Sequence, residues 1–447
     1  MQYLRFFLLV YLIVASNFSF SVPAADYWFR IQGSNTVGAK LAPHCAAAFL
    51  KHKQATDVFI KETGEINEYE VVGTVKEGDY LHSRRIHIAA HGSSTGFKAL
   101  LAAEAEVAMS SRPIKNKEVV QLSNWGDMTS LEAEHTIAID GLAVLVNPVN
   151  PINGLTIEQV AKLFSGEITN WKELGGFDVP VTLYARDDRS GTWDTFKNLV
   201  LRKKYKLSDS AQRFESNDDL SDRVAEDKGG IGFSGLASVR QSKALAISDE
   251  GTQPLHPSVM TIATEDYPLS RRLYFYTLPM RKTKIIDDFV SFCQSYEGQE
   301  IVSDVGFVSQ NILEVEVIPE EHWPETYRQL ASTAKRLSVN FRFASGSSKL
   351  DNKASVDLKR MADYLAGKQG RYQVYLVGFT DVHERLKIEE LISKLRALAV
   401  QARLMYSRVP VADAIGMGSF LPVAASKQGH SKLKNARVEI WLKTVAE

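Results

Sequence analysis

The sequence predicts an α/β protein with two domains. From Asp26 to Ser309, short apolar strands alternate with helical patterns and polar turns, an order typical of α/β folds with parallel sheets. From Leu337 onward, the order strand, helix, strand, helix, strand predicts a small α/β sandwich. The chain has 447 residues, too many for one ordinary hydrophobic core, which also favours two or three domains.

The elements of the first domain follow in order. Its predicted strands are Tyr27–Ile31, Arg85–Ala90, Val107–Met109, Ala143–Val146 and Val181–Tyr184. Its predicted helices cover Val37–His52, a segment from Phe97, Thr156–Phe164 and a segment from Trp193. The helix at 156–164 has the clearest start, because Thr156 is a favourable cap and Glu158 places an acid in the first turn.

A charged connector separates the domains. Pro319 and Pro324 bracket an acidic stretch that breaks regular structure. We therefore expect a first domain at residues 26–315, a linker at 316–335 and a second domain at 336–447. The second domain has predicted strands at Leu337–Phe343, Tyr372–Val377 and Ala436–Leu442, and predicted helices at Asn352–Leu365 and Lys387–Tyr406.

The first residues have the pattern of an export signal. A basic start, an apolar run from Phe6 to Ala15 and small residues up to Ala24 predict a signal peptide at residues 1–24. An uncleaved membrane anchor is the alternative. With 53 basic and 53 acidic residues, the chain lacks the basic excess of a nucleic-acid-binding protein. The two cysteines, Cys45 and Cys293, either pair or remain separate buried thiols.

Three turns between a strand and a helix carry hydroxyl groups and glycine. They are Gly33–Thr36, Gly92–Gly96 and Ser190–Thr192. In α/β sheets such turns gather at the carboxyl ends of strands, where helix N-termini offer free N–H groups and partial positive charge. Arg186, just before the third turn, adds a planar fork of donors. If the turns converge, they form a cage for a tetrahedral oxyanion; the alternative is a set of unrelated solvated turns.

The same segments give the first domain a family resemblance. The three turns, the strand Val107–Pro113, the Arg186 loop, the phrase Leu163–Trp171 and the stretch Gly229–Gly235 resemble the periplasmic phosphate-binding proteins of ATP-driven transporters. This resemblance implies two α/β lobes that close on the ligand about a hinge, no catalysis and no cofactor. It implies phosphate as ligand, and an ABC transporter permease as a partner.

Carried over residue by residue, the resemblance implies a set of phosphate-binding residues. They are Thr36, Val37 through its backbone, Ser93, Ser111, Arg186, Asp188, Ser190, Gly191 and Thr192. Asp188 is expected to hold Arg186 by charge pairing. At Ser111 the family often has an aspartate that accepts the proton of phosphate, and a serine both donates and accepts. Selectivity between phosphate and sulfate is therefore open.

The second domain resembles the peptidoglycan-binding domain of the OmpA family. The resemblance rests on Val339–Ser347, Val377–Asp381, Leu391–Ala397 and Asn435–Ile440. It implies that Asp381 pairs with the ammonium of diaminopimelate and that Arg396 binds its carboxylate. Departures from the family are Glu384, Glu389 and Ala436. Together the resemblances imply a location in the periplasm of a Gram-negative bacterium, at the cell wall or outer membrane.

Other chemistry fits the sequence less well. Gly92–Gly96 matches the spacing of a nucleophile elbow, with His91 or His135 as tempting partners. The corresponding alternative function is a phosphoester hydrolase with Ser93 or Thr192 as nucleophile. His82, His87 and His91 have weak metal-ligand spacing. Three functions therefore stand: an oxyanion-binding protein tethered to peptidoglycan, a phosphoester hydrolase, and a cell-wall-bound structural or adhesion protein with a degenerate ligand site.

Overall fold

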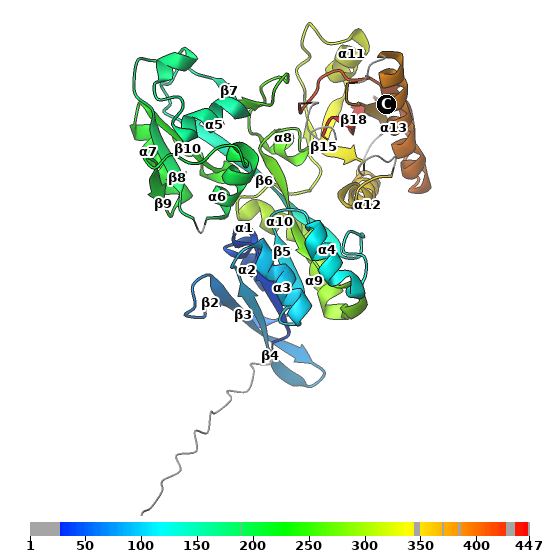
Figure 1. The fold of residues 1–447 in the computed structure, drawn as a ribbon. Coiled ribbons are helices and arrows are strands. Elements are labelled where there is room, and N and C mark those ends of the chain that lie inside the picture. Colours follow the sequence, from blue (N-terminus) through cyan, green and yellow to red (C-terminus); the bar gives the residue numbers. More distant parts are fainter. Residues whose placement is uncertain are drawn as a thin grey trace, which may run out of the picture.

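The computed structural model describes residues 27–188, 190–343, 349–368, 371–382, 386–425 and 434–445. The predicted signal peptide at residues 1–24 lies outside these ranges, as do residues 345–347 and Glu384. Figure 1 shows two α/β lobes and, beside them, a C-terminal α/β unit. Among the described residues, no helix has both the length and the apolar character to span a bilayer.

The first lobe contains one half of a long mixed sheet. In sheet order its strands are β2 (Thr56–Glu62), β3 (Glu68–Glu77), β4 (Tyr80–Ala89), β1 (Phe29–Gly33), β5 (Val107–Ser110) and β13 (Ser270–Tyr276). Its helices are α1 (Asn35–Gly38), α2 (Leu41–His52), α3 (Ser93–Ala102), α4 (Asn116–Leu122), α9 (Lys284–Gln294) and α10 (Tyr296–Asp304). Aromatic rings from the sheet and from α2 and α9 fill its core, with the Phe29 and Phe289 centroids 5.0 Å apart.

The two cysteines lie in this core. Cys45 on α2 and Cys293 on α9 are buried free thiols. Burial, and then a hydrogen bond with Cys45, raises the pKa of the Cys293 thiol well above its ordinary value. In this structure the two cysteines are therefore neighbouring free thiols and not a disulfide.

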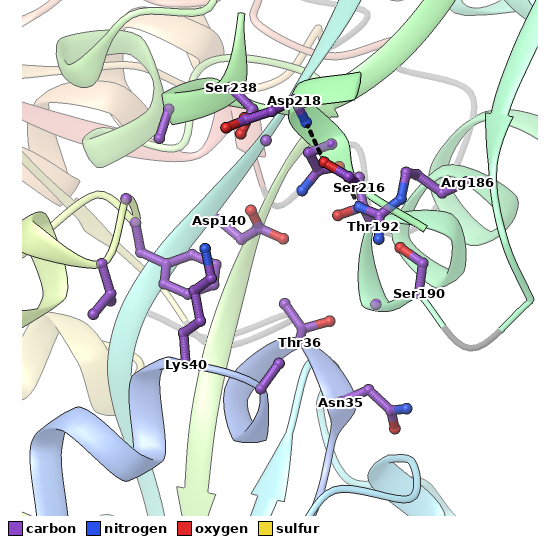
Figure 2. A pocket seen from close by; sticks show the side chains of 18 of the residues that line it. Asn35, Thr36, Lys40, Asp140, Arg186, Ser190, Thr192, Ser216, Asp218 and Ser238 are labelled. Atoms are coloured by element: carbon purple, nitrogen blue, oxygen red, sulfur yellow. Dashed lines mark hydrogen bonds between the residues drawn. The ribbon is translucent and has the colours of Figure 1, made fainter. Parts of the chain in front are cut away.

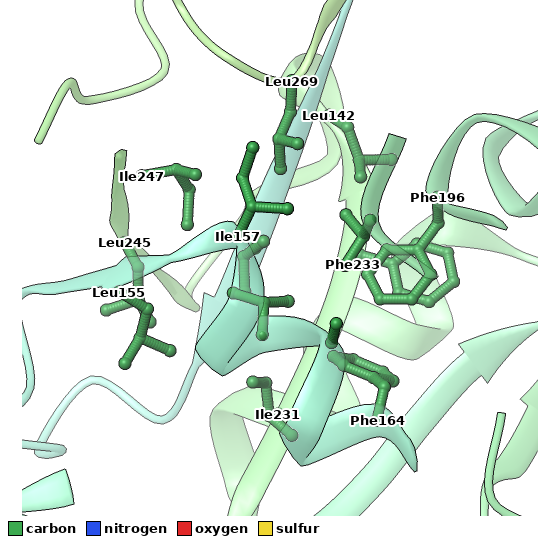
Figure 3. Packing of buried hydrophobic residues seen from close by; sticks show 14 of the residues in the cluster. Leu142, Leu155, Ile157, Phe164, Phe196, Ile231, Phe233, Leu245, Ile247 and Leu269 are labelled. Carbon is green, nitrogen blue, oxygen red and sulfur yellow. The ribbon is translucent and has the colours of Figure 1, made fainter. Parts of the chain in front are cut away.

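The second lobe contains the other half of the sheet. Its strands are β6 (Glu134–Val146), β10 (Gly230–Gly235), β8 (Thr182–Arg186), β9 (Gln212–Phe214) and β11 (Lys243–Ala244), with β7 (Gly154–Thr156) and β12 (Ala246–Ser248) in a separate pair. Its helices are α5 (Ile157–Ser165), α6 (Gly191–Phe196), α7 (Asn217–Glu226) and α8 (Val259–Ala263). Figure 3 shows the core, where the rings of Phe196 and Phe233 stack with centroids 4.0 Å apart.

Strand β6 passes from one lobe into the other. Residues 134–141 pair with β13 of the first lobe, and residues 142–146 pair with β10 of the second. At the crossing point, Gly141 packs so closely on α8 that an added Cβ would lie 2.2 Å from Cδ1 of Ile262. The lobes therefore meet about this strand, which is the place for the expected hinge.

The sheet is mixed, so the prediction of parallel sheets was only partly right. β1 is parallel to β4 and β5, and β8 is parallel to β9 and β10. β6, however, runs antiparallel to both β10 and β13, and β2, β3 and β4 form an antiparallel meander. β2 and β3 were not predicted from the sequence; β2 is mostly exposed and lacks the buried apolar face that identifies a strand.

Two helices of the first lobe have other boundaries than predicted. The helix expected at Val37–His52 is divided into α1 and α2, because Pro43 in the first turn of α2 lacks an N–H and its ring crowds the carbonyl of Ala39. α3 begins at Ser93, four residues before the expected start at Phe97. The predicted cap of α5 is confirmed, since the Thr156 hydroxyl accepts a 3.1 Å hydrogen bond from Gln159 N.

The C-terminal unit is a sheet covered by helices. Its sheet order is β14 (Glu314–Val315), β15 (Lys335–Arg342), β18 (Arg437–Thr444), β16 (Tyr372–Gly378) and β17 (Val411–Gly416). Its helices are α11 (Glu325–Thr333), α12 (Asn352–Ala366) and α13 (Leu386–Tyr406). The predicted strands and helices of this unit are confirmed; β17 was missed. The segment expected as a linker contains α11, whose Tyr327 packs edge-on against Trp441 of β18.

A buried cluster of charges joins the C-terminal unit to the lobes. Asp266, between α8 and β13, accepts contacts from Arg336 at 2.8 Å and Arg342 at 3.2 Å, both on β15. Arg272 of β13 contacts Glu265, in the segment between α8 and β13, and, at 2.8 Å, Asp351 at the start of α12. The unit is therefore held to the lobes by paired charges rather than by the connector alone.

Candidate functional site

The three predicted turns meet where the lobes face each other. Ser111, at the end of β5, donates its backbone N–H to the Ser93 hydroxyl at 3.1 Å, which joins the second turn to that strand. The first and third turns touch, because a Cβ added to Gly191 would lie 1.9 Å from the Thr36 hydroxyl oxygen. The turns start the helices α1, α3 and α6, so the N-termini of all three helices lie at this place.

One arginine, which the sequence analysis did not select, lies between these turns. Arg271 of β13 donates to the Thr36 hydroxyl at 2.9 Å, to the Gly191 carbonyl at 3.0 Å and to the Ser111 carbonyl at 3.5 Å. Its Nε donates to Asp140 of β6 at 3.1 Å. Burial lowers the pKa of Arg271, and the neighbouring Asp140 opposes that shift. Two adjacent arginines inside an otherwise apolar strand were the signal that could have identified it.

Arg186 lies at the other side of the cavity, at the end of β8. Its Nε donates to the Phe214 carbonyl at 3.1 Å, and its terminal nitrogens contact Asn217 and the Glu215 carbonyl. Burial lowers the pKa of its guanidinium, and the nearby Asp187 carboxylate opposes that shift. Arg186 is thus anchored to the loop that precedes α7.

The expected pairing of Asp188 with Arg186 is wrong. Asp188 contacts Arg213 of β9 at 2.6 Å, and the carboxylate near Arg186 is that of Asp187, at 3.8 Å. The reason is geometric: the chain turns outward after β8, so the Asp188 side chain is 87% exposed and lies above the neighbouring parallel strand.

A cavity of about 690 Å³ opens between the lobes. Figure 2 shows Thr36 on one wall and Arg186, Ser190 and Thr192 on the opposite wall. Among the predicted residues, its lining contains Thr36, Arg186, Ser190, Gly191 and Thr192. Ser93 and Ser111 are outside the lining, and Asp188 lines a second cavity of about 500 Å³. The side chain of Val37 is fully buried, which leaves only its backbone for a ligand.

The charges in the cavity are mixed. Besides the hydroxyl groups and Arg186, its lining includes Lys40 and five carboxylates, those of Asp140, Asp187, Glu215, Asp218 and Asp304. Asp140 forms an ion pair with Arg271, and the carboxylate of Asp187 lies beside the guanidinium of Arg186. The hydroxyl groups, the helix N–H groups and Arg186 are the parts of this lining that suit a small anion held by hydrogen bonds, whereas Arg271 lies outside the lining.

The residues of a hydrolase do not meet at this place. The Ser93 hydroxyl is hydrogen-bonded to Ser111, and His91 contacts Glu68 at 2.9 Å. His135 is buried beside Thr277, and burial lowers its pKa to about 4. His87 shares Glu68 with His91, but within the described ranges no group of three or more His, Cys, Asp or Glu residues has the arrangement of a metal site.

The second predicted site lies between β16, α13 and the start of β18. Asp381 accepts a 2.9 Å hydrogen bond from the side chain of Asn435. Arg396 of α13 donates to the Phe379 carbonyl at 3.1 Å and to the Thr380 hydroxyl at 2.8 Å. Burial lowers the pKa of Arg396, and the charge of Asp381 opposes that shift. The predicted ammonium and carboxylate partners are therefore neighbours in one site.

One of the noted departures belongs to the interior of this unit. Glu389 is 2% exposed and accepts a 2.5 Å hydrogen bond from Ser419, so it adds no acidic surface.

Comparison with known proteins matches both parts of the chain. Residues 64–297 match the PBP superfamily domain, and residues 342–436 match the OmpA family. The phosphate-binding protein PstS of Bacillus subtilis is 30% identical over 229 residues, which cover 50% of this chain and 70% of that protein. PstS of Borreliella burgdorferi is 28% identical over 233 residues, covering 51% and 80%. The crystal structure of an ABC-type phosphate transport receptor from Vibrio cholerae is 24% identical, covers 63% of this chain and 99% of that one, and superposes with a TM-score of 0.47.

Proposed function

Because this chain belongs to the PBP superfamily and carries an OmpA family domain after it, we propose that it is an exported binding protein for phosphate or a similar tetrahedral oxyanion. The observation that carries the proposal is the meeting of three hydroxyl-rich helix starts, α1, α3 and α6, between the lobes. These starts offer N–H and hydroxyl donors without adding a full charge. Arg186 and Arg271 supply the positive charge. No bond is made or broken.

The residues proposed to bind the anion are those of the converging turns. Thr36 and the Val37 backbone bind from α1, Ser93 and Ser111 from α3 and β5, and Ser190, Gly191 and Thr192 from α6. Ser111 is the selectivity position: because a hydroxyl donates as well as accepts, it tolerates both protonated phosphate and fully ionised sulfate.

Calorimetric titration of the mature full-length protein tests this function. We expect phosphate binding, and we expect Arg186→Ala to weaken it at least about 30-fold, since removing a buried charge-assisted donor costs roughly 2 kcal/mol or more. Sulfate is titrated in parallel at two pH values, because the ratio of the two affinities measures the selectivity between phosphate and sulfate that Ser111 is proposed to set. Arg223→Ala, an exposed arginine of the same lobe, is the matched control.

The titration also decides between the remaining functions. Absence of heat with either anion contradicts the proposal and favours a wall-bound structural or adhesion protein with a degenerate ligand site. Turnover of a phosphoester that disappears in Ser93→Ala favours the hydrolase instead.

We further propose that the C-terminal unit, from β14 to β18, tethers the protein to peptidoglycan in the periplasm, with the two lobes as the receptor. Asp381 pairs with the ammonium of diaminopimelate and Arg396 with its carboxylate, and the contact between their charges supports a shared site. A wall-held receptor stores or presents the anion, for example to an ABC transporter permease, at the inner face of a Gram-negative outer membrane.

Sedimentation with purified peptidoglycan tests the tether. The wild-type protein is expected in the pellet, and Asp381→Ala and Arg396→Ala are each expected to move most of it to the supernatant, because either change leaves a partly buried charge without its partner. Lys359→Ala, an exposed basic residue on α12 of the same unit, is the control and remains in the pellet. Equal sedimentation of all variants contradicts the assignment of these residues.

A further inference from the structure

Helix α13 is apolar on two opposite faces. Its inner face packs Ala397, Val400 and Leu404 into the core of the C-terminal unit, where each is fully buried. Its outer face carries a second line of apolar residues, which we call the outer stripe: Leu391, Leu395, Leu398, Ala402 and Met405. In this stripe Leu391 is 58%, Leu395 54% and Met405 64% exposed.

The spacing of the outer stripe is that of a helix–helix seam. The steps along the stripe are four, three, four and three residues, which is the heptad pattern of positions that interlock between paired helices. Single exposed leucines are ordinary on a soluble protein, but an unbroken apolar line along one helix face marks an interaction site. The elements that contact α13, namely β16, β17, β18 and α12, leave this face open in the described parts of the chain.

We propose that the outer stripe binds the outer stripe of a second copy of this chain, with the two helices antiparallel. The stripe is symmetric about Leu398, so antiparallel pairing sets Leu391 against Met405 and Leu395 against Ala402. Large residues thus meet large ones at the ends, and the smaller alanine accommodates Leu395. Knobs from each helix fill the holes of the other.

The charges beside the stripe favour the antiparallel arrangement. Exposed Glu390 lies near the start of α13, and exposed Arg408 lies just beyond its end, eighteen residues or five helical turns later and therefore on the same flank of the stripe. Antiparallel pairing about Leu398 sets Glu390 of one copy beside Arg408 of the other and aligns the two helix dipoles in opposite directions. Exposed Lys394, on the same flank, then lies beside the uncharged Gln401 of the other copy.

Pairing through α13 would strengthen binding to peptidoglycan, an inference that rests on the proposed function. Arg396 lies on α13 next to Leu395 of the stripe, but its side chain turns inward to Thr380. Two copies paired through α13 therefore present two wall-binding sites at a fixed separation. Two linked sites bind a repeating polymer more tightly than either one alone.

Sedimentation velocity of the mature full-length protein tests the pairing. Between about 1 and 100 µM, the range in which weak interfaces assemble, the wild type is expected to shift from monomer to dimer. Leu395→Glu is expected to remain monomeric with an unchanged circular dichroism spectrum. Leu101→Glu, at a helical leucine of the first lobe that is 44% exposed, is the control and still dimerises. A wild type that stays monomeric, or a Leu395→Glu variant that dimerises normally, overturns the proposal.

Cysteine cross-linking tests the direction of the helices. Only Leu398 faces its own equivalent in the antiparallel pair, so Leu398→Cys is expected to form a covalent dimer under mild oxidation and Leu391→Cys is not. In a parallel pair every stripe residue faces its equivalent, so equal cross-linking of both variants overturns the antiparallel arrangement. Both native cysteines are buried, and the wild type gives the background.

Discussion

Replacing Arg271 with alanine is expected to lower the free energy of unfolding by about 3–5 kcal/mol, the cost of leaving one member of a buried ion pair alone. Asp140, which is 8% exposed, would lose the ion-pair partner that lies 3.1 Å from its carboxylate. The same change removes the donor that joins Thr36 of one lobe to Gly191 of the other. Urea unfolding at neutral pH measures the loss, and a change below 1 kcal/mol would contradict this role of Arg271.

A double variant separates stability from anion binding. Arg271→Met with Asp140→Leu replaces the buried pair by apolar side chains, which often restores stability. We expect this variant to unfold close to the wild type but to bind phosphate at least tenfold more weakly, since the guanidinium beside Thr36 and Gly191 is gone. Wild-type phosphate affinity in the double variant would show that Arg271 acts only as a link between the lobes.

The sequence was sufficient for the local parts of this site. Thr156 was recognised as a helix cap, and Ser190–Thr192 as a turn before a helix, because both features depend on residues within one turn. The meeting of the turns was a hypothesis, since nothing local places Thr36 within reach of Gly191. The Asp188 pairing was wrong because the direction of a side chain after β8 depends on the neighbouring strand β9. Arg271 was missed for the same reason: its partners come from β6, α1 and α6.

In the fold, too, only features that depend on residues close in sequence were predictable. Helices α12 and α13 were predicted within a residue or two, because the helical spacing of their apolar residues is a local pattern. The direction of β6 was not predictable from its own apolar sequence, since strand polarity follows from which strands return beside it. The docking of the C-terminal unit depends on Glu265 and Asp266, which in sequence resemble an ordinary exposed acidic turn.

The second large effect is expected at that interface. Asp266 is 4% exposed and lies among Arg336, Arg342 and Arg437, and its side chain also accepts from Asn340 at 2.9 Å. Asp266→Asn keeps the shape but leaves buried guanidinium groups without their shared counter-charge, which is expected to cost about 3–5 kcal/mol. Asp178→Asn, which removes an exposed surface pair, is the control and is expected to cost less than about 1 kcal/mol.

The pH dependence of stability gives an independent test of the same cluster. Burial raises the pKa of the Asp266 carboxyl, but Arg336, Arg437 and Arg342 outweigh burial and hold that pKa below its ordinary value of 3.8. The pKa of Glu265 is likewise held below its ordinary 4.5, where burial is outweighed first by Arg272. Because the unfolded chain then binds protons more readily than the folded one, the stabilisation is complete above about pH 4.5 and is lost as the pH falls through the folded-state values. Urea unfolding between pH 7 and pH 3 should therefore show a wild-type decline below pH 4.5 that is shallower in Asp266→Asn, whereas equal slopes would mean that the charge of Asp266 does not hold the C-terminal unit to the lobes.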